Sequence, residues 1–177
     1  MGRFLYRLVP TEYGWAGVAG SKAGVTRVSL PAPDRACALA VLKEGRGEEF
    51  VETEHEFGQV ADDVAAYFGG ERVELACKLD LSGFTEFQRE VWEAARKIGY
   101  GEIRSYKWVA DTMGRPGAAR AVGQALSKNP VPVIVPCNRV VRADGGLGGF
   151  GSGLRWKIML LEMERRRKGS KILDCGR

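Results

Sequence analysis

Histidine is nearly absent from this chain of 177 residues, in which His55 is the only one. The sequence also has no apolar stretch long enough to cross a membrane, and its first residues lack the apolar run and cleavage site of a signal peptide. We therefore expect a cytoplasmic protein without a membrane partner. The length allows one ordinary domain or two small ones, with a real hydrophobic core.

Paired cysteines are missing too, because Cys37, Cys77, Cys137 and Cys175 form no Cys-x-x-Cys motif. Zinc sites usually use such pairs, so we predict no metal and no cofactor. Cys37 lies in a helix-like stretch and Cys77 in an apolar run, and we interpret both as small core residues. The alternative is a metal site built from Cys37, Cys77 and His55. The position of Cys175 near the C-terminus suggests no role.

Positive charge is concentrated in the second half of the chain. Residues 1–80 hold 9 Lys and Arg against 13 Asp and Glu, whereas residues 81–177 hold 18 against 9. The excess favours binding of nucleic acid by the second half. The alternative is a solvated surface with a basic tail. The accompanying change in composition predicts an N-terminal domain over 1–82, a second domain over 83–168 and a basic tail over 169–177.

The first half shows the pattern of a small sheet with helices. Short apolar runs separated by glycines over residues 3–30 predict antiparallel strands. Residues 34–44 predict a helix capped by Asp34, and a second helix ends at Gly69-Gly70. The apolar run 73–77 predicts one more strand.

The second half is predicted to be mainly helical, which makes the chain α+β as a whole. Thr85 and Gln88 form a Thr-x-x-Gln capping box at the start of a helix. Ser105 can cap a short helix, and a further helix follows over 118–127 after the turn at 114–117. Two short helices joined in this way are typical of a helix-turn-helix, although close helix packing is an alternative.

The second helix of this pair carries one arginine among small residues. Arg120 is flanked by Ala118, Ala119 and Gly123, which permit close approach to DNA but cannot read base edges. We therefore predict DNA binding by shape with Arg120 inserted. Arg115, in the preceding turn, is included among the predicted DNA contacts.

Cys137 has the setting of a nucleophile. It follows Pro136 at the end of an apolar run and stands two residues before Arg139. The next residue, where a base would be useful, is Asn138, whose amide cannot accept a proton near neutral pH. A glycine-rich stretch over 145–153 follows. Its Gly-x-Gly-x-x-Gly match lacks a βαβ context, so we interpret the stretch as a loop over a pocket.

The stretch from Phe87 to Glu164 resembles the DNA-binding and active-site domain of the O6-alkylguanine-DNA alkyltransferases. The first half fits the family's variable N-terminal domain, an RNase H-like sheet with helices, only in outline. The resemblance implies a winged helix-turn-helix in the second half. The matching segments are Phe87-Gln88-x-x-Val91-Trp92, Gly101-Glu102-x-x-Ser105-Tyr106, Gly117-Ala118-Ala119-Arg120-Ala121-Val122-Gly123, Asn129-Pro130-x-Pro132-x-Ile134-x-Pro136-Cys137-x-Arg139-Val140-Val141 and Leu160-Leu161-x-x-Glu164.

The resemblance implies an activity and a partner. A monomer would bind double-stranded DNA containing O6-alkylguanine and transfer the alkyl group to Cys137, irreversibly and once per molecule. Arg120 matches the arginine that takes the place of the flipped nucleotide. Tyr106 matches the tyrosine that crowds the phosphate backbone, and Asn129 matches a hinge between the recognition helix and the active-site segment.

The resemblance also implies the substrate pocket. Val135 and Val140 would offer backbone groups to the extruded base, and Arg139 lies beside them in sequence. The lid would include Gly151 and Phe150, the latter in place of the usual tyrosine. Glu164 matches the carboxylate that orients the family's catalytic histidine.

Asn138 departs from the family pattern, which is Pro-Cys-His-Arg. The asparagine can still hold a bridging water, and Glu164 could act on that water directly. About 3 per cent of a free thiol is thiolate at pH 7, so losing the base costs about thirtyfold in rate, or about 2 kcal/mol. Such a loss slows a single-turnover reaction without abolishing it.

Two other interpretations stay open. One is a lesion-binding module that flips alkylated guanine without reacting and recruits another repair pathway. The other is a structural winged-helix protein in which Cys137 is buried and inert.

Overall fold

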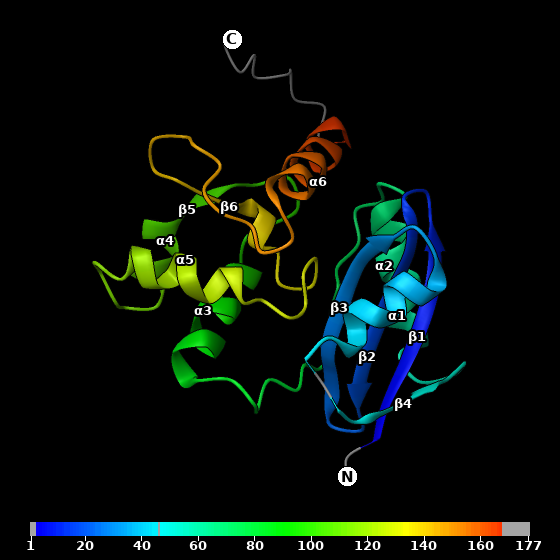
Figure 1. The fold of residues 1–177 in the computed structure, drawn as a ribbon. Coiled ribbons are helices and arrows are strands. Elements are labelled where there is room, and N and C mark those ends of the chain that lie inside the picture. The colour runs from blue at the N-terminus through cyan, green and yellow to red at the C-terminus, as the bar shows by residue number, and fades with distance from the viewer. Residues whose placement is uncertain (1–2, 46, 168–177) are drawn as a thin grey trace.

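The computed structural model describes residues 3–45 and 47–167, apart from the side chain of Arg167. The predicted tail over 169–177, including Cys175, lies outside the described residues. Figure 1 shows an N-terminal sheet with two helices beside a mainly helical second part. The predicted α+β class is confirmed.

The N-terminal sheet has the strand order β3-β2-β1-β4. The first three strands, β1 (Arg3–Thr11), β2 (Gly14–Ser21) and β3 (Gly24–Ala32), are antiparallel as predicted. The fourth strand, β4 (Glu49–Glu52), pairs parallel with β1 and was not predicted. Its only apolar residues are Phe50 and Val51, a pair too short to form an alternating pattern.

Alternation along the strands gives each face of the sheet its own helix. Leu8 on one face packs with α1 (Arg35–Lys43), whereas Val9 on the other packs with α2 (Gly58–Phe68). Figure 1 shows the sheet between these helices. Because α2 lies on the face that joins the second part's core, its residues can reach the site described below.

The helix boundaries follow the predicted caps. Asp34 Oδ1 accepts a hydrogen bond from the backbone N–H of Cys37 at 2.8 Å, and Gly69 forms the C-cap of α2. The prediction that Cys37 is a core residue is wrong, because Cys37 is exposed. The buried face of α1 passes instead through Ala38 and Leu42. Cys77, also predicted to be in the core, is half-buried.

The strand predicted over 73–77 is also wrong. Val73, Leu75 and Cys77 alternate because they pack against the core, and among the described residues this segment pairs with no strand. Only Leu79 forms a bridge, with Val25 of β3. Alternation of apolar and polar residues indicates that one side of a segment is buried. It does not show that another strand lies beside the segment to pair with it.

The second part is built from short helices around the segment that carries Cys137. The Thr85 capping box is confirmed, and α4 and α5 pack together as the predicted helix-turn-helix. Ser105 caps α4 through a hydrogen bond from Trp108 N. The elements are α3 (Glu86–Arg96), β5 (Arg104–Ser105), α4 (Tyr106–Thr112), α5 (Ala119–Ser127), the 3-10 helix η1 (Cys137–Arg139), β6 (Val140–Val141) and α6 (Leu154–Arg167).

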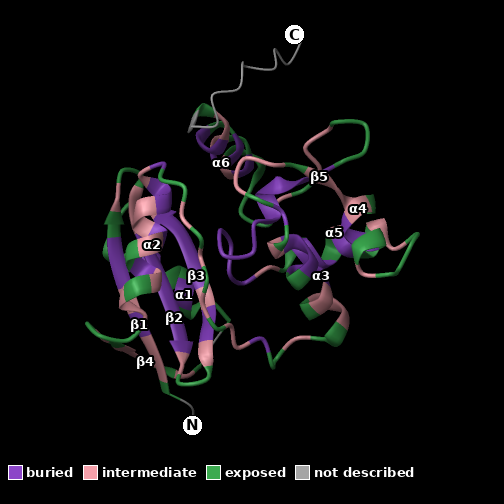
Figure 2. Ribbon diagram, turned by 180° about the vertical axis from the view of Figure 1, so that it is seen from behind, coloured by how far each residue is buried: buried purple, intermediate pink, exposed green. Residues whose placement is uncertain are grey.

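One hydrophobic core joins the two parts. It runs from the sheet and α2 to Trp92, Val135 and Leu160, and Figure 2 shows buried segments on the facing sides of both parts. The backbone also links them, because Val28 N donates to Pro130 O at 2.9 Å. A domain boundary near residue 82 stays a prediction. No helix among the described residues is long and apolar enough to span a bilayer.

Candidate active site around Cys137

A strained turn delivers Cys137 to its position. Between α5 and η1 the backbone of Val133 has a φ of 75°, a left-handed conformation that is rare for a β-branched residue. Val135 N donates to Val131 O at 2.9 Å and closes the turn. Such strain costs on the order of 1–3 kcal/mol and is found mainly at functional sites. Cys137 is then the first residue of η1.

Asn129 fixes both this turn and the sulfur. Its Nδ2 donates to Val135 O at 2.9 Å and to Cys137 Sγ at 3.1 Å, and its Oδ1 accepts from Val131 N at 3.0 Å. The predicted hinge residue is therefore a direct partner of the sulfur. A donor to sulfur favours the thiolate over the thiol.

The surroundings of the sulfur act on its ionisation in opposite directions. Cys137 is only 7% exposed, and this burial raises the pKa of its thiol. The Asn129 hydrogen bond and the positive charge of Lys157 both lower the pKa, but by less. The thiol is therefore buried, yet it has a hydrogen-bond donor and a cation as neighbours.

Lys157, on α6, was not identified from the sequence. Its side chain is fully buried, and its Nζ donates to the backbone carbonyls of Val140, Leu147 and Gly149. Burial lowers the pKa of this ammonium to about 8. The only sequence signal was a lysine between Trp156 and an apolar run. Surface lysines in helices look the same, so the contact with the site could not be predicted.

The glycine-rich stretch 145–153 lies against Tyr106 and the end of α5. At Gly148, whose φ is +69°, an added Cβ would lie 2.3 Å from Tyr106 Oη. At Gly151 it would lie 2.5 Å from Ser127 O. These two positions need glycine because the loop packs so closely. Tyr106 Oη also donates to Gly149 O at 3.5 Å, and Phe150 is half-buried against the core.

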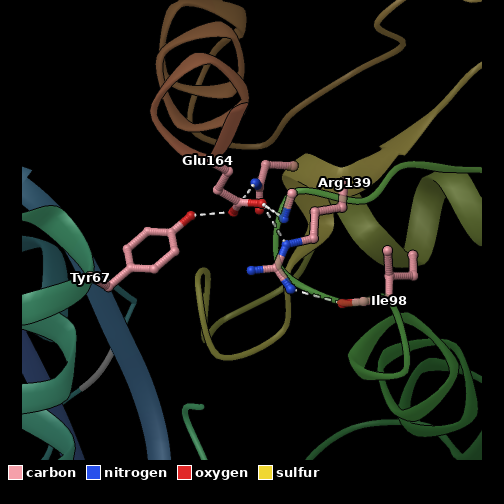
Figure 3. Close-up of polar contacts among 6 residues, drawn as sticks. Tyr67, Ile98, Arg139 and Glu164 are labelled. Atoms are coloured by element: carbon pink, nitrogen blue, oxygen red, sulfur yellow. Dashed lines mark hydrogen bonds and ion pairs between the residues drawn. The ribbon is translucent and has the colours of Figure 1, made fainter. Parts of the chain in front are cut away.

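The carboxylate of Glu164 is surrounded by hydrogen-bond donors (Figure 3). Its Oε1 accepts from Tyr67 Oη at 2.6 Å and from Asn138 Nδ2 at 3.0 Å. Its Oε2 accepts from Arg139 Nε at 2.8 Å and from Gly101 N at 2.9 Å. A carboxylate offers about four acceptor directions, and these donors fill them. The expectation that Glu164 acts directly on a water beside the sulfur is therefore not supported.

Asn138 turns one end of its amide toward Glu164 and the other end away. The residue is 1% exposed, and its Oδ1 is buried without a hydrogen-bond partner in the described part of the chain. A buried acceptor without a partner is costly, and a water commonly fills such a position. The geometry is compatible with the predicted role of Asn138 in holding a water.

The predicted pocket residues have other partners. Arg139 is buried, donates to Ile98 O at 2.8 Å and pairs with Glu164, so its head group supports the site. Val135 was predicted to offer backbone groups to a base. However, its N–H is used in the turn and its carbonyl accepts from Asn129 and from Cys137 N, so that prediction is not supported. The carbonyl of Val140 accepts from Lys157 Nζ at 2.6 Å, and a carbonyl oxygen can accept two hydrogen bonds.

The predicted DNA-binding residues gather on the helix-turn-helix. Arg120 is exposed on α5, and no hydrogen bond or ion pair holds it within the described residues. Ala118, at the start of α5, is half-buried, as are Ala119 and Gly123. Arg115 is half-exposed and pairs with Glu90 at 2.9 Å. Arg120 is thus the freer of the two arginines.

An open groove of about 400 Å³ lies between β3 and the loop that follows α5. Asn129, Gly151 and Trp156 belong to its lining, but Cys137 does not. The groove therefore reaches the glycine-rich stretch and Asn129, and Cys137 is not among its lining residues. No group of three or more His, Cys, Asp or Glu side chains suited to a metal occurs in the described residues.

Comparison with known proteins identifies the family. A model of the 6-O-methylguanine DNA methyltransferase, DNA binding domain, matches residues 86–166. A methylated-DNA–protein-cysteine methyltransferase of Mycolicibacterium paratuberculosis is 46% identical over 167 residues, which cover 94% of this chain and 96% of that protein. The chain belongs to the O6-methylguanine DNA methyltransferase family.

Other members of this family agree in sequence and fold. The Mycobacterium leprae protein of the same name is 53% identical over 109 residues, which cover 62% of this chain and 66% of that protein. The crystal structure of Mycobacterium tuberculosis OGT in complex with DNA matches with a TM-score of 0.77 and 39% identity. That match covers 92% of this chain and 94% of the other.

Replacing Lys157 by Met tests its electrostatic role at the sulfur. Loss of the positive charge is expected to raise the pKa of Cys137, so Cys137 should react more slowly with iodoacetamide at neutral pH. Because the pKa of Lys157 is about 8, the difference from wild type should be largest below pH 8 and fade above it. Peptide mass analysis of labelled Cys137 from pH 6 to 9 gives the rates.

Lys107→Met is the matched control, because Lys107 is exposed and pairs with Asp111 on the surface. Its labelling profile should overlay that of wild type. An unchanged profile for Lys157→Met would contradict the assigned effect of Lys157.

Proposed function

We propose that this protein repairs DNA by transferring an alkyl group from O6 of guanine to Cys137, once per molecule. The observation that carries the proposal is the setting of the sulfur, which has the Asn129 amide as a donor and the Lys157 ammonium as a cationic neighbour. Both groups favour the thiolate form, which a cysteine that only fills a hydrophobic core does not need. Family membership supports the same chemistry, since relatives are named methylated-DNA–protein-cysteine methyltransferases.

The transfer is a displacement at the alkyl carbon. The Cys137 thiol loses its proton, and the thiolate attacks the carbon bonded to O6. A carbon–sulfur bond forms, the carbon–oxygen bond breaks, and its electron pair returns to the guanine, which takes up a proton. The thioether product is stable, so no step regenerates the thiol.

The target oxygen lies inside the base stack, so the nucleotide has to leave the duplex before it reacts. Extruding it costs a few kcal/mol, and less for a damaged base that pairs poorly. The free, exposed guanidinium of Arg120 suits insertion into the vacated space, and the small residues around it allow α5 to approach the DNA. We assign Tyr106, beside the lid, to the phosphate contact that favours extrusion.

The lid and the hinge frame the entry to the sulfur. We assign Phe150 and Gly151 to the cover of the flipped base and the carbonyl of Val140 to one hydrogen bond with it. Because Cys137 is only 7% exposed, we infer that the stretch 145–153 shifts when the base enters. Lys157 donates hydrogen bonds to two carbonyls of this stretch, so a shift of the stretch would also move the ammonium relative to the sulfur.

A second candidate function is lesion binding without transfer, with recruitment of another repair pathway. It is favoured by the lack of a base at the sulfur, because Asn138 is an amide and the acceptor directions of Glu164 are filled. The two candidates agree on the DNA contacts and differ only in the fate of Cys137.

Two further expectations complete the proposal. A reactive free thiol keeps its function in a reducing compartment, which supports the cytoplasm as its location. We also propose that the protein acts as a monomer, with a domain boundary near residue 82.

Mass analysis after incubation with a duplex containing O6-methylguanine separates the two candidates. We expect Cys137 to gain one methyl group, about 14 mass units, because transfer to sulfur is irreversible. Cys137→Ser should bind the same duplex and gain nothing. Tight binding with an unmodified Cys137 after long incubation at pH 8.5 would reject transfer in favour of lesion binding.

Arg120→Ala tests the insertion step. Transfer from the duplex should slow about tenfold or more, because the extruded state loses the side chain that fills its place. Transfer from free O6-methylguanine base, which needs no extrusion, should be unchanged. The control is Arg72→Ala, which removes an exposed arginine from the first half of the chain.

The comparison of the two substrates makes this test specific. Equal slowing with duplex and free base would assign Arg120 to the pocket and would contradict insertion. An unchanged rate with the duplex would contradict any role in extrusion.

A further inference from the structure

We propose that Tyr67, in the N-terminal part, is a positioning residue for alkyl transfer, which acts through Glu164 on the amide of Asn138. This inference rests on the proposed function. Tyr67 lies 97 residues before Glu164 and belongs to α2, a helix that packs on β1 and β2 of the sheet. Figure 3 shows its hydroxyl reaching across to the carboxylate.

The bond between Tyr67 and Glu164 has the features of a strong hydrogen bond. Its length of 2.6 Å falls in the range of a hydroxyl donating to a carboxylate. Both partners are buried, at 0% and 1% exposure, so water does not compete for either. Burial, and then the charge of Glu164, raise the pKa of the Tyr67 hydroxyl well above its usual value, so it remains a donor throughout the physiological range.

Donors alone surround Glu164, and this fixes the orientation of Asn138. Tyr67 shares Oε1 with Asn138, while Arg139 and Gly101 occupy Oε2. Asn138 therefore has to present its Nδ2 to Glu164. The amide is planar, so its Oδ1 points away from Glu164, and it is the buried acceptor without a partner. Asn138 directly follows Cys137 in η1, so the two side chains leave neighbouring backbone positions.

The buried Oδ1 is an acceptor for a water, on the residue directly after the nucleophile. A water that donates one hydrogen to Oδ1 can donate the other to the thiolate and stabilise it. Without the Tyr67 hydroxyl, Oε1 keeps only the amide as a partner, and the carboxylate loses one of the four hydrogen bonds that fix its plane. The amide would then sample other orientations, and the water would lose its fixed acceptor.

A structural role for Tyr67 alone would predict something different. The Tyr67 ring packs edge-on against the rings of Phe68 and Tyr100, with distances between ring centroids of 5.4 Å and 6.1 Å. A phenylalanine at position 67 would keep both contacts. If the Tyr67 hydroxyl had a purely structural role, its removal would change the stability of the protein by the same amount whether or not Asn138 is present. A positioning hydroxyl should matter only while Asn138 is present.

The test is a double-mutant cycle of Tyr67→Phe and Asn138→Ala, read by single-turnover methyl transfer from duplex DNA. Tyr67→Phe should slow transfer about tenfold, the loss typical of one hydrogen bond to a charged group. Added to Asn138→Ala it should cause no further slowing. The matched control is Tyr6→Phe, which removes another tyrosine–glutamate hydrogen bond, to Glu52, and should leave the rate unchanged.

The outcomes separate this inference from the proposed function. Thermal melting verifies that each variant is folded. Equal slowing by Tyr67→Phe with Asn138 present and absent, or no slowing at all, overturns the positioning role. The rates at which iodoacetamide labels Cys137 should rank the variants in the same order as the transfer rates, and this measurement needs no DNA. If wild type fails to transfer but the order holds, the proposed function is rejected, whereas the effect of Tyr67 on Asn138 and on the reactivity of Cys137 stands.

Discussion

The buried carboxylate of Glu164 is the interaction on which the site depends. Donors from α2, the loop after α3, and η1 meet at its two oxygens, so one side chain joins segments that are far apart in sequence. Removing the negative charge of Glu164 would leave the buried guanidinium of Arg139 without its ion-pair partner. Such a loss typically costs 3–5 kcal/mol of folding stability. The same bonds hold the turn that begins at Cys137. Glu164 therefore contributes both to the geometry of the nucleophile and to the joining of the two parts, which the shared hydrophobic core also holds together.

Among the residues that the structure describes, this arrangement offers the sulfur no free carboxylate and no imidazole as a base. The acceptor directions of Glu164 are filled, and Asn138 contributes an amide. What remains near Cys137 is electrostatic, a hydrogen bond from Asn129 and the ammonium of Lys157, and both act against the burial that raises the thiol pKa. Such a site can react through a thiolate that forms in equilibrium with solvent. A protein that reacts once does not need a fast cycle, so this slower route is compatible with repair.

Local signals in the sequence predicted local structure well. Asp34, Thr85 and Ser105 cap helices as expected, and the glycine-rich loop contacts Lys157, a neighbour of Cys137. Predictions that depended on distant partners were less reliable. The run 73–77 has a strand's alternation without a strand beside it, and Cys37 lies on the outer face of its helix. The contacts of Lys157 and Tyr67 with the site could not be predicted, because in the sequence neither residue differs from an ordinary residue of a helix.

The rate of methyl transfer as a function of pH, for wild type and for Asn138→His, tests the central claim most directly. If no base serves Cys137, the wild-type rate should rise about tenfold per pH unit from 6.5 to 8.5, in step with the thiolate fraction. Asn138→His, which supplies a base, should flatten that rise and increase the rate at pH 7 by about thirtyfold or more, because the raised pKa of Cys137 leaves less thiolate than a free thiol has. A wild-type rate that is flat over this range would contradict the claim, because another group would then be taking the proton.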